Sequence, residues 1–357
     1  MPKPTRKTLP KDFDAMLERG DLDELKAVFD KSILNATGGY GKQVALAFGE
    51  APEELIRWLV EQGADLEAGD SYGKRPLQAH AGDWRGKPGL LLDLGADIEG
   101  ASNDGNTALH YAADSGREEH VQLLLERGAN PWAGGREGTP LVYTLRRFAN
   151  IDLDRKVGIL EMLLGAMAKA KGVGASDIIT DEMREQVKEI GQTFEFHREN
   201  YAKDGVAAAS AGLERLYALF GVTPVGARKM HDGKAPIVAD PGPWAEQHQM
   251  LWEYLVPGKG PADTVQGEVI RITGRMSDEI YRNGGGNWDA DYRKMGLALI
   301  GHLGSGNPLP ADMLSGAEGL LPTHSSDGDT AELCRYAVAW VALNPEPVKR
   351  GKVGYKR

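Results

Sequence analysis

The amino-acid sequence predicts an all-α protein, with a solenoid of stacked helix pairs in its first half and a separate helical domain after it. Three observations lead to this prediction. The first half has an internal repeat, apolar residues in the second half have helical spacing, and the second half lacks the alternation of apolar and polar residues that is typical of β-strands. At 357 residues, the chain is also long enough for two domains.

The repeat shows itself through two landmarks that keep the same period. One landmark is the set of related stretches "EQGADLEA", "DLGADIEG" and "ERGANPWA", at residues 61–68, 93–100 and 126–133. The other is the set of leucines Leu77, Leu109 and Leu141, which are 32 residues apart. Two independent landmarks with one period indicate repeated structural units.

The unit is clearest at residues 104–133. A turn at Gly105 precedes a short helix capped by Thr107, and Gly116 separates it from a second helix that ends at Gly128. No single pair of such helices can bury its own apolar face, so several pairs must stack.

These residues resemble the ankyrin repeat family over roughly residues 12–166. Residues 16–30 look like an N-terminal capping repeat and 41–68 like a divergent copy. The resemblance implies that His110 stabilises turns between repeats, and Gln78 at the equivalent place agrees because glutamine hydrogen-bonds but is no general base at neutral pH.

The resemblance also implies that another protein binds along a concave face of turn tips and first helices. Carried onto this chain, the expected partner-binding residues are Tyr72, Lys74, Trp84, Asn103, Asp104, Asn106, Asp114, Trp132, Arg136, Arg146 and Arg147. Aromatic residues and arginines are frequent hot spots, so Tyr72, Trp84, Trp132, Arg146 and Arg147 are the preferred anchors. The alternatives are that the two tryptophans fill gaps between irregular repeats and that the two arginines form a solvated pair.

The domain boundaries follow from where these patterns stop. We expect a basic disordered tail at 1–11, ankyrin repeats at 12–166, a linker at 167–176, a helical domain at 177–345 and a basic tail at 346–357. Within the helical domain, helices are expected at 177–201, 206–220, 242–256, from about 264 to the glycines at 284–286, from Asp289, and at 329–343. The residues of this domain do not identify its family. It is either a helical domain of its own or a set of strongly degenerate helical repeats, and the lack of a visible period of about 30 residues favours the first.

Charge argues against nucleic acid as the main partner. The net charge is −10, and nine of the 42 basic residues lie in the two ends, leaving 33 against 52 acidic residues. A phosphate backbone would be repelled by most of that surface, whereas a basic protein would be attracted. A single cysteine, Cys334, and no apolar run of membrane-spanning length predict a cytoplasmic protein.

No cofactor or metal site is expected. "GGYGKQ" (38–43) lacks the spacing of a phosphate loop, and no histidine pair has the spacing of a zinc site. "HSSDGDTAE" (324–332) lacks the full calcium-loop pattern and predicts a polar turn that caps the last helix.

The predicted function is therefore non-catalytic recognition of another protein, in one version as an inhibitor or immunity-type protein against a basic partner. Two alternatives stay open: an adaptor with one partner for each half, and an enzyme that its repeats bring to a target. The enzyme's candidate residues would be His248, Glu246, Glu253, His302 and Asp289, and their convergence in one pocket would favour it.

Overall fold

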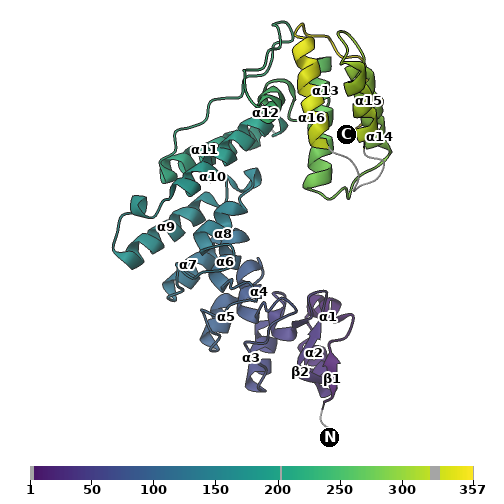
Figure 1. Cartoon of the computed structure of the whole chain (residues 1–357). Helices are drawn as coiled ribbons and strands as arrows, with labels where there is room; N and C mark the ends of the chain where they lie inside the picture. Colours follow the sequence, from purple (N-terminus) through teal and green to yellow (C-terminus); the bar gives the residue numbers. More distant parts are fainter. Residues whose placement is uncertain (1–3, 202, 322–329, 357) are drawn as a thin grey trace. The chain divides into compact units, whose positions relative to one another are not determined.

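The computed structural model describes residues 4–201, 203–321 and 330–356, and these residues form two compact units. The first unit comprises residues up to 191 together with 203–225, and the second comprises 192–201 and 226–356. Sixteen α-helices are found among the described residues, which confirms the all-α prediction in its main part (Figure 1). Residues 324–329 of the predicted polar turn lie outside the described residues.

The first unit begins with a small sheet, which the sequence did not predict. Strands β1 (Arg6–Thr8), β2 (Ser32–Gly38) and β3 (Gln43–Val44) lie in the order β1-β2-β3, with β1 parallel to β2 and β3 antiparallel to it. Residues 6–11 are therefore no disordered tail. Backbone pairing fixes β1 while its side chains stay exposed, and buried Leu9 anchors the segment through a 2.9 Å hydrogen bond from its N–H to the carbonyl of Thr37.

Helix pairs follow the sheet, in the stacked arrangement that the repeat predicted. After α1 (Phe13–Arg19) and α2 (Leu22–Ala27), an inner row consists of α4 (Pro76–Gly82), α6 (Ala108–Asp114) and α8 (Pro140–Arg146). The outer row consists of α3 (Glu53–Glu61), α5 (Pro88–Asp93), α7 (Glu118–Glu126) and α9 (Val157–Lys171). Figure 1 shows the two rows side by side. The repeated leucines Leu77, Leu109 and Leu141 are buried between them, which is the apolar contact that makes stacking favourable.

The stack continues beyond residue 166. The expected linker at 167–176 is in part helical, because α9 runs on to Lys171 with Met167 and Ala168 buried and ends at Gly172 in the left-handed conformation. Helices α10 (Asp181–His197) and α11 (Lys203–Phe220) come next, and most of both belongs to the first unit.

Small residues explain why α11 packs so closely on the repeats. A Cβ on Gly212 would lie 1.8 Å from the carbonyl oxygen of Leu153, so only glycine permits this contact. Arg215 and Glu161 form a 3.0 Å ion pair beside it. The predicted domain boundary at residue 177 is therefore wrong, because the first unit includes residues up to 191 and 203–225. The spacing of apolar residues along a helix does not reveal a contact that depends on a glycine.

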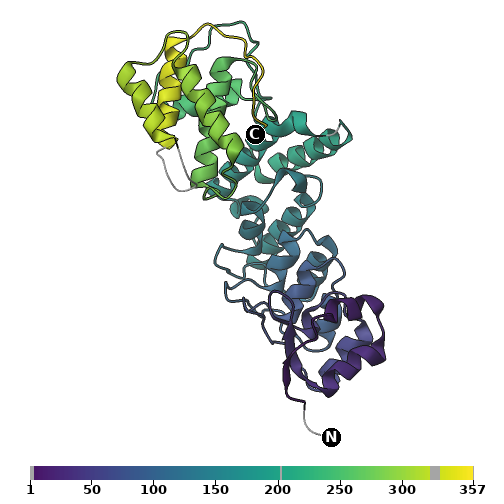
Figure 2. The same ribbon diagram turned by 90° about the vertical axis from the view of Figure 1, so that its right-hand side faces the viewer.

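The second unit is a helical bundle around α13. It contains α12 (Trp244–Leu255), α13 (Val265–Tyr281), α14 (Ala290–Leu303), α15 (Ala311–Leu320) and α16 (Thr330–Leu343), and Figure 2 shows the last four side by side. Their core includes Ile272, Met276, Leu299 and Trp340. All of these helices except α15 were predicted, and Asp289 caps α14 as expected by accepting backbone hydrogen bonds from Asp291 and Tyr292.

The C-terminal residues 345–356 are an ordered strap and not the expected free tail. Val265 N–H donates to the carbonyl of Val348 at 2.8 Å, and Arg350 N–H donates to that of Asp263 at 3.0 Å. Buried Tyr355 donates its hydroxyl proton to Glu268 at 2.6 Å. Most of the charged side chains of this segment stay exposed, so basic composition alone gives a false impression of disorder.

Glu268 also holds a fully buried ion pair inside α13. The guanidinium of Arg271, which is 0% exposed, donates to the carboxylate at 2.7 and 2.9 Å, and Ala262 N–H donates to it at 2.9 Å. Such a pair is stable because every carboxylate oxygen is satisfied. Within the described residues, no helix is long and apolar enough to cross a membrane.

Candidate protein-binding face

Four turns project from the stack at residues 39–42, 71–74, 103–106 and 135–138, and we call these turns the fingers. Each finger contacts its neighbour through the backbone. The bonds run from Ser71 N–H to the carbonyl of Gly41 (3.0 Å), from Asn103 N–H to that of Tyr72 (3.1 Å), and from Arg136 N–H to that of Asp104 (2.7 Å). This ladder holds the finger backbones at fixed positions, so their side chains are presented by a pre-organised surface.

Polar side chains of the inner helices fix the fingers from below. His110 accepts a hydrogen bond from Thr107 N–H at Nδ1 (3.0 Å), and its Nε2 lies 3.1 Å from the carbonyl oxygen of Gly138. Because Nδ1 is an acceptor, the ring is neutral with its proton on Nε2. Burial lowers the pKa of His110, which agrees with this neutral form.

Gln78 does the same work one repeat earlier. Its side-chain oxygen accepts from Arg75 N–H (2.6 Å), and its amide donates to the carbonyls of Gly100 and Asn106. The structural interpretation of His110 and Gln78 is therefore confirmed.

Three aromatic side chains, two in the fingers and one in the loop after α4, are largely exposed: Tyr40 (99%), Tyr72 (62%) and Trp84 (68%). Tyr40 and Tyr72 occupy the same position in adjacent fingers, 32 residues apart. Sequence reasoning missed Tyr40. The signal was present, because "GYGK" at 39–42 and "SYGK" at 71–74 keep the repeat period.

Several of the predicted binding residues are accessible. Tyr72, Trp84, Asn103, Asp104 and Arg136 are exposed. Lys74 is half-buried with its ammonium 4.9 Å from the ring centroid of Tyr111. These six residues stay candidates for contact with a partner.

Asn106 is not available for contact. It is only 5% exposed, because Gly135 of the next finger packs directly against its side-chain oxygen. Its backbone carbonyl accepts the hydrogen bond from Gln78. The turn pattern did not reveal that this finger tip faces its neighbour.

Asp114, Arg146 and Arg147 take part in ion pairs within the first unit. Arg147 lies 3.3 Å from Asp114 and stacks on Tyr143, with 4.9 Å from the guanidinium carbon to the ring centroid. Arg146 lies 2.8 Å from Glu182 of α10. The arginines are exposed, but a partner would have to compete with these contacts, which makes them weaker anchors than expected.

Trp132 is the last member of a second ladder, which runs through the loops that precede the fingers. It stands at the repeat position of Glu67 and Glu99, whose carboxylates accept backbone N–H groups from Asp97 (2.9 Å) and Asn130 (2.6 Å) of the following loops. The neighbour of Trp132 in the stack is the end of α9, whereas Glu67 and Glu99 each have a following loop as neighbour.

The indole therefore donates to a helix carbonyl, that of Met167, at 3.1 Å. The ammonium of Lys171 lies 3.5 Å from the indole ring centroid. Half-buried Trp132 fills the gap left by an irregular neighbour, as the alternative interpretation proposed, and is no free anchor.

The candidate catalytic residues of the second unit lie in different surroundings. His248 is bonded to the hydroxyl of Thr273 at 2.9 Å, and burial lowers its pKa to about 4. Asp289 caps α14, and Glu253 accepts from the side chain of Gln249 at 2.8 Å. Among residues 4–201, 203–321 and 330–356, no group of three or more metal-ligating side chains is found.

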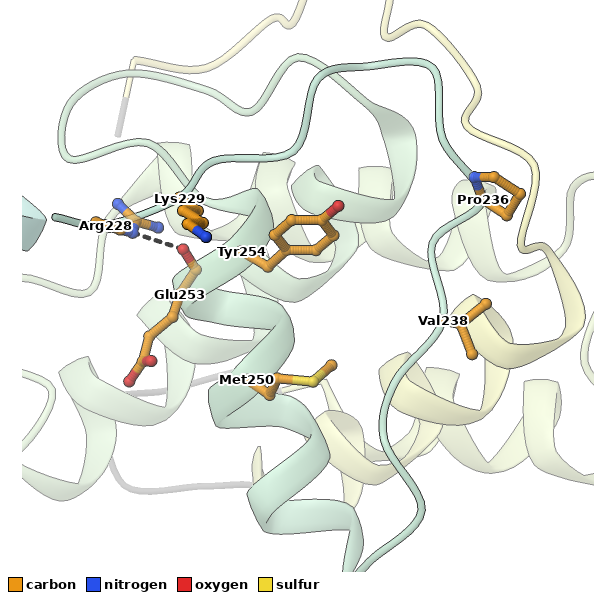
Figure 3. A pocket seen from close by; sticks show the side chains of 7 residues that line it. All are labelled: Arg228, Lys229, Pro236, Val238, Met250, Glu253 and Tyr254. Carbon is orange, nitrogen blue, oxygen red and sulfur yellow. Dashed lines mark hydrogen bonds between the residues drawn. The ribbon is translucent and has the colours of Figure 1, made fainter. Parts of the chain in front are cut away.

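A shallow groove of about 430 Å³ lies between α12 and the extended segment before it (Figure 3). It is lined by Arg228, Lys229, Pro236, Val238, Met250, Glu253 and Tyr254. Arg228 is held by the backbone carbonyls at the end of α12, as the dashed line in Figure 3 marks for Glu253. Glu253 lines this groove, but His248, Glu246, His302 and Asp289 do not.

Comparison with known proteins identifies the repeats. Residues 42–134 match the model of ankyrin repeats, in three copies. This segment is therefore a set of ankyrin repeats, and the fold described above extends the stack on both sides of it.

Several known proteins are similar in sequence to this chain over part of their length. The chain is 34% identical over 125 residues to the probable E3 ubiquitin-protein ligase XBOS34 of Oryza sativa subsp. japonica, covering 33% of this chain and 24% of the relative. It is 35% identical over 94 residues to human ankyrin repeat and SOCS box protein 6 (24% and 22%) and 41% over 83 residues to human B-cell lymphoma 3 protein (21% and 18%). The matched part thus spans about a quarter or less of each relative, and the likeness concerns a module and not a whole protein.

Proposed function

We propose that this chain recognises another protein through the fingers and the loop after α4. The single observation that carries the proposal is the exposure of Tyr40 and Tyr72 on a backbone ladder that holds their fingers in place, with Trp84 exposed in the loop after α4. Large aromatic side chains bury much apolar area on binding and lose little entropy when their backbone is already fixed. Ankyrin repeats at 42–134 support a role in protein–protein interaction.

The finer version of the proposal is an inhibitor or immunity-type role toward a basic partner in the cytoplasm. The net charge of −10 supports it through long-range attraction. Exposed glutamates on the outer helices would contribute to that field, among them Glu53, Glu54, Glu118, Glu119 and Glu126. Failure to retain basic proteins at moderate salt would remove this version and leave the recognition face untouched.

A second candidate is the two-partner adaptor, and the groove in Figure 3 favours it. The exposed Val238 and half-buried Met250 give the second unit an apolar surface of its own. An adaptor would lose one partner with the finger variants and another with Met250→Glu.

The experiment that tests the main proposal is a binding measurement on the full chain. A partner captured with the wild-type chain is purified and titrated against Tyr40→Ala, Tyr72→Ala and Trp84→Ala, with exposed Tyr281→Ala in the second unit as the matched control. A hot-spot truncation is expected to weaken binding by at least about tenfold, while the control binds as the wild type does. Equal affinity of all four variants would refute the proposal.

A further inference from the structure

The tripeptide Tyr-Gly-Lys occurs at residues 40–42 and again at 72–74, in the same place of two adjacent fingers. The two turns are in direct contact, since Ser71 donates to the carbonyl of Gly41 with both its N–H (3.0 Å) and its hydroxyl (2.6 Å). The fingers further along the stack carry Asp-Gly-Asn and Arg-Glu-Gly instead. This pair of fingers therefore presents two exposed tyrosines, the exposed Lys42 and the half-buried Lys74, whose ammonium lies 4.9 Å from the ring centroid of Tyr111.

Neither lysine has an acidic partner of its own. In the part of the chain that the structure describes, the ammonium groups of Lys42 and Lys74 form no ion pair. One oxygen of the nearby carboxylate of Asp70, Oδ1, accepts from the backbone N–H groups of Tyr72 (2.8 Å) and Lys74 (2.9 Å). Burial lowers the pKa of Lys74 more than the charges of Asp70 and Asp83 raise it, so its ammonium is incompletely compensated within the fold and a carboxylate in direct contact would stabilise it.

Lys42 sits in an unfavourable backbone conformation. Its φ of 56° is the only positive value of a non-glycine residue among the described residues. A lysine there is less stable than a glycine, since its Cβ crowds the backbone in the left-handed region. A strained residue with an exposed charged side chain points to a role for that side chain outside the fold.

We propose that these two fingers bind an extended acidic segment of the partner protein, with one carboxylate on each lysine and the tyrosine rings packed along the segment. The two fingers are in direct contact through Ser71 and Gly41, and in a polyproline-like chain residues three apart recur on one side at about 9 Å, which long lysine side chains on adjacent fingers can span. Two acidic residues three positions apart would therefore reach both lysines.

The surface suits a peptide better than a nucleic acid. Asp70 and Asp104 flank the lysines, and Glu137 follows in the next finger, so a continuous phosphate backbone would meet repulsion that a peptide with spaced carboxylates avoids. The inference rests on the proposed function, and it concerns only the segment that touches these fingers, whatever the net charge of the whole partner.

The test uses a labelled synthetic peptide of repeated Glu-Pro-Pro, with Gln-Pro-Pro and Lys-Pro-Pro repeats as controls, titrated to about 1 mM against the full chain. The glutamate peptide is expected to bind at least about tenfold more tightly than either control, and less tightly as salt increases. Equal binding of the three peptides, or no binding of the glutamate peptide, would overturn the inference. So would tighter binding of a single-stranded oligonucleotide, which would make the surface a nucleic-acid site.

Variants separate this inference from the proposed function. Lys42→Ala and Lys74→Ala should each weaken the glutamate peptide several-fold, and together they should abolish its binding, whereas Lys188→Ala on α10 should have no effect. Lys42→Gly should weaken it equally while the chain melts no lower than the wild type, which excludes a folding defect. Loss of the natural partner in Tyr40→Ala and Tyr72→Ala but not in the lysine variants would leave protein recognition standing and reject the acidic segment. Retention of the partner in both sets would reject both.

Discussion

The side chain of His110 connects its own repeat to the next finger by hydrogen bonds, and we call this connection the clamp. It joins Thr107 of its own helix to Gly138 of the next finger, and Gln78 makes the equivalent bonds one repeat earlier. His110→Ala should lower the free energy of unfolding by about 1–3 kcal/mol, because buried backbone groups lose their partners. His110→Gln should recover most of the loss, as measured by urea unfolding. Equal damage by alanine and glutamine would contradict the clamp.

His80 gives the first unit a dependence on pH. It is fully buried, with Nε2 3.0 Å from the carbonyl oxygen of Leu46, and burial, with the charge of Lys87, lowers its pKa to about 4. Between about 4 and the ordinary value of 6.5, the unfolded chain binds the extra proton. The stabilising contribution is therefore complete above pH 6.5 and is lost as the pH falls toward 4.

This predicts that the free energy of unfolding falls by up to about 1.4 kcal/mol per pH unit because of His80 alone. Urea unfolding of the wild type and of His80→Gln between pH 4.5 and about 7.5 isolates that contribution. Parallel pH profiles of the two proteins would show that His80 is not its source.

Sequence reasoning succeeded at residues whose role lies within one repeat and was less successful where the role depends on a neighbour. His110 could be assigned because its equivalent, Gln78, is visible in the sequence. Trp132 and Asn106 could not be assigned in this way. The end of α9 covers Trp132, and the backbone of Gly135 covers Asn106. Tyr40 escaped although its finger keeps the repeat period, because that finger joins strands β2 and β3 and precedes the first helix pair in which the repeat is plain.

At the scale of elements, the packing of α11 depends on Gly212. Gly212→Ala would place a methyl group 1.8 Å from the carbonyl oxygen of Leu153 and should destabilise the first unit by about 3 kcal/mol or more. Gly165 of α9 has no atom within 4 Å of such a methyl group, so Gly165→Ala should stabilise by up to about 1 kcal/mol. Circular dichroism during thermal unfolding compares the two. An unchanged melting temperature of Gly212→Ala would mean that α11 does not pack against Leu153.

The C-terminal strap is the second element that can be tested directly. Tyr355→Phe removes the hydroxyl that donates to buried Glu268 at 2.6 Å and should cost about 2 kcal/mol, since hydrogen bonds to a charged group are among the stronger ones. Guanidinium unfolding followed by the tryptophans of the second unit measures it. An unchanged unfolding transition would mean that residues 345–356 do not pack on the second unit and form a free tail.

The elements themselves were largely predictable, and their ends were not. The helical period locates α10 to α14 and α16, because each has an apolar face that it must bury. The sheet at residues 6–44 and the strap carry no such period. Both depend on backbone pairing with distant residues, such as Leu9 with Thr37 and Val265 with Val348.

At the scale of the whole chain, each unit carries a surface that the other does not share. The first has the fingers, with a periodic set of exposed side chains, and the second has the groove beside α12. Repetition explains the difference, because one favourable turn repeated every 32 residues gives a continuous row of contacts. We therefore expect the proposed recognition to occur first through the fingers.

The most direct test of that claim is site-specific photo-crosslinking in native lysate, with the photoreactive residue placed at position 72, at position 122 on the outer helix α7, or at position 250 in the groove. Recognition through the fingers predicts a partner that is crosslinked from position 72 and not from the other two, and that is lost when Tyr40 is also replaced by alanine. Crosslinking from position 122 or 250 in the absence of any from position 72 would contradict it and move the binding surface off the fingers.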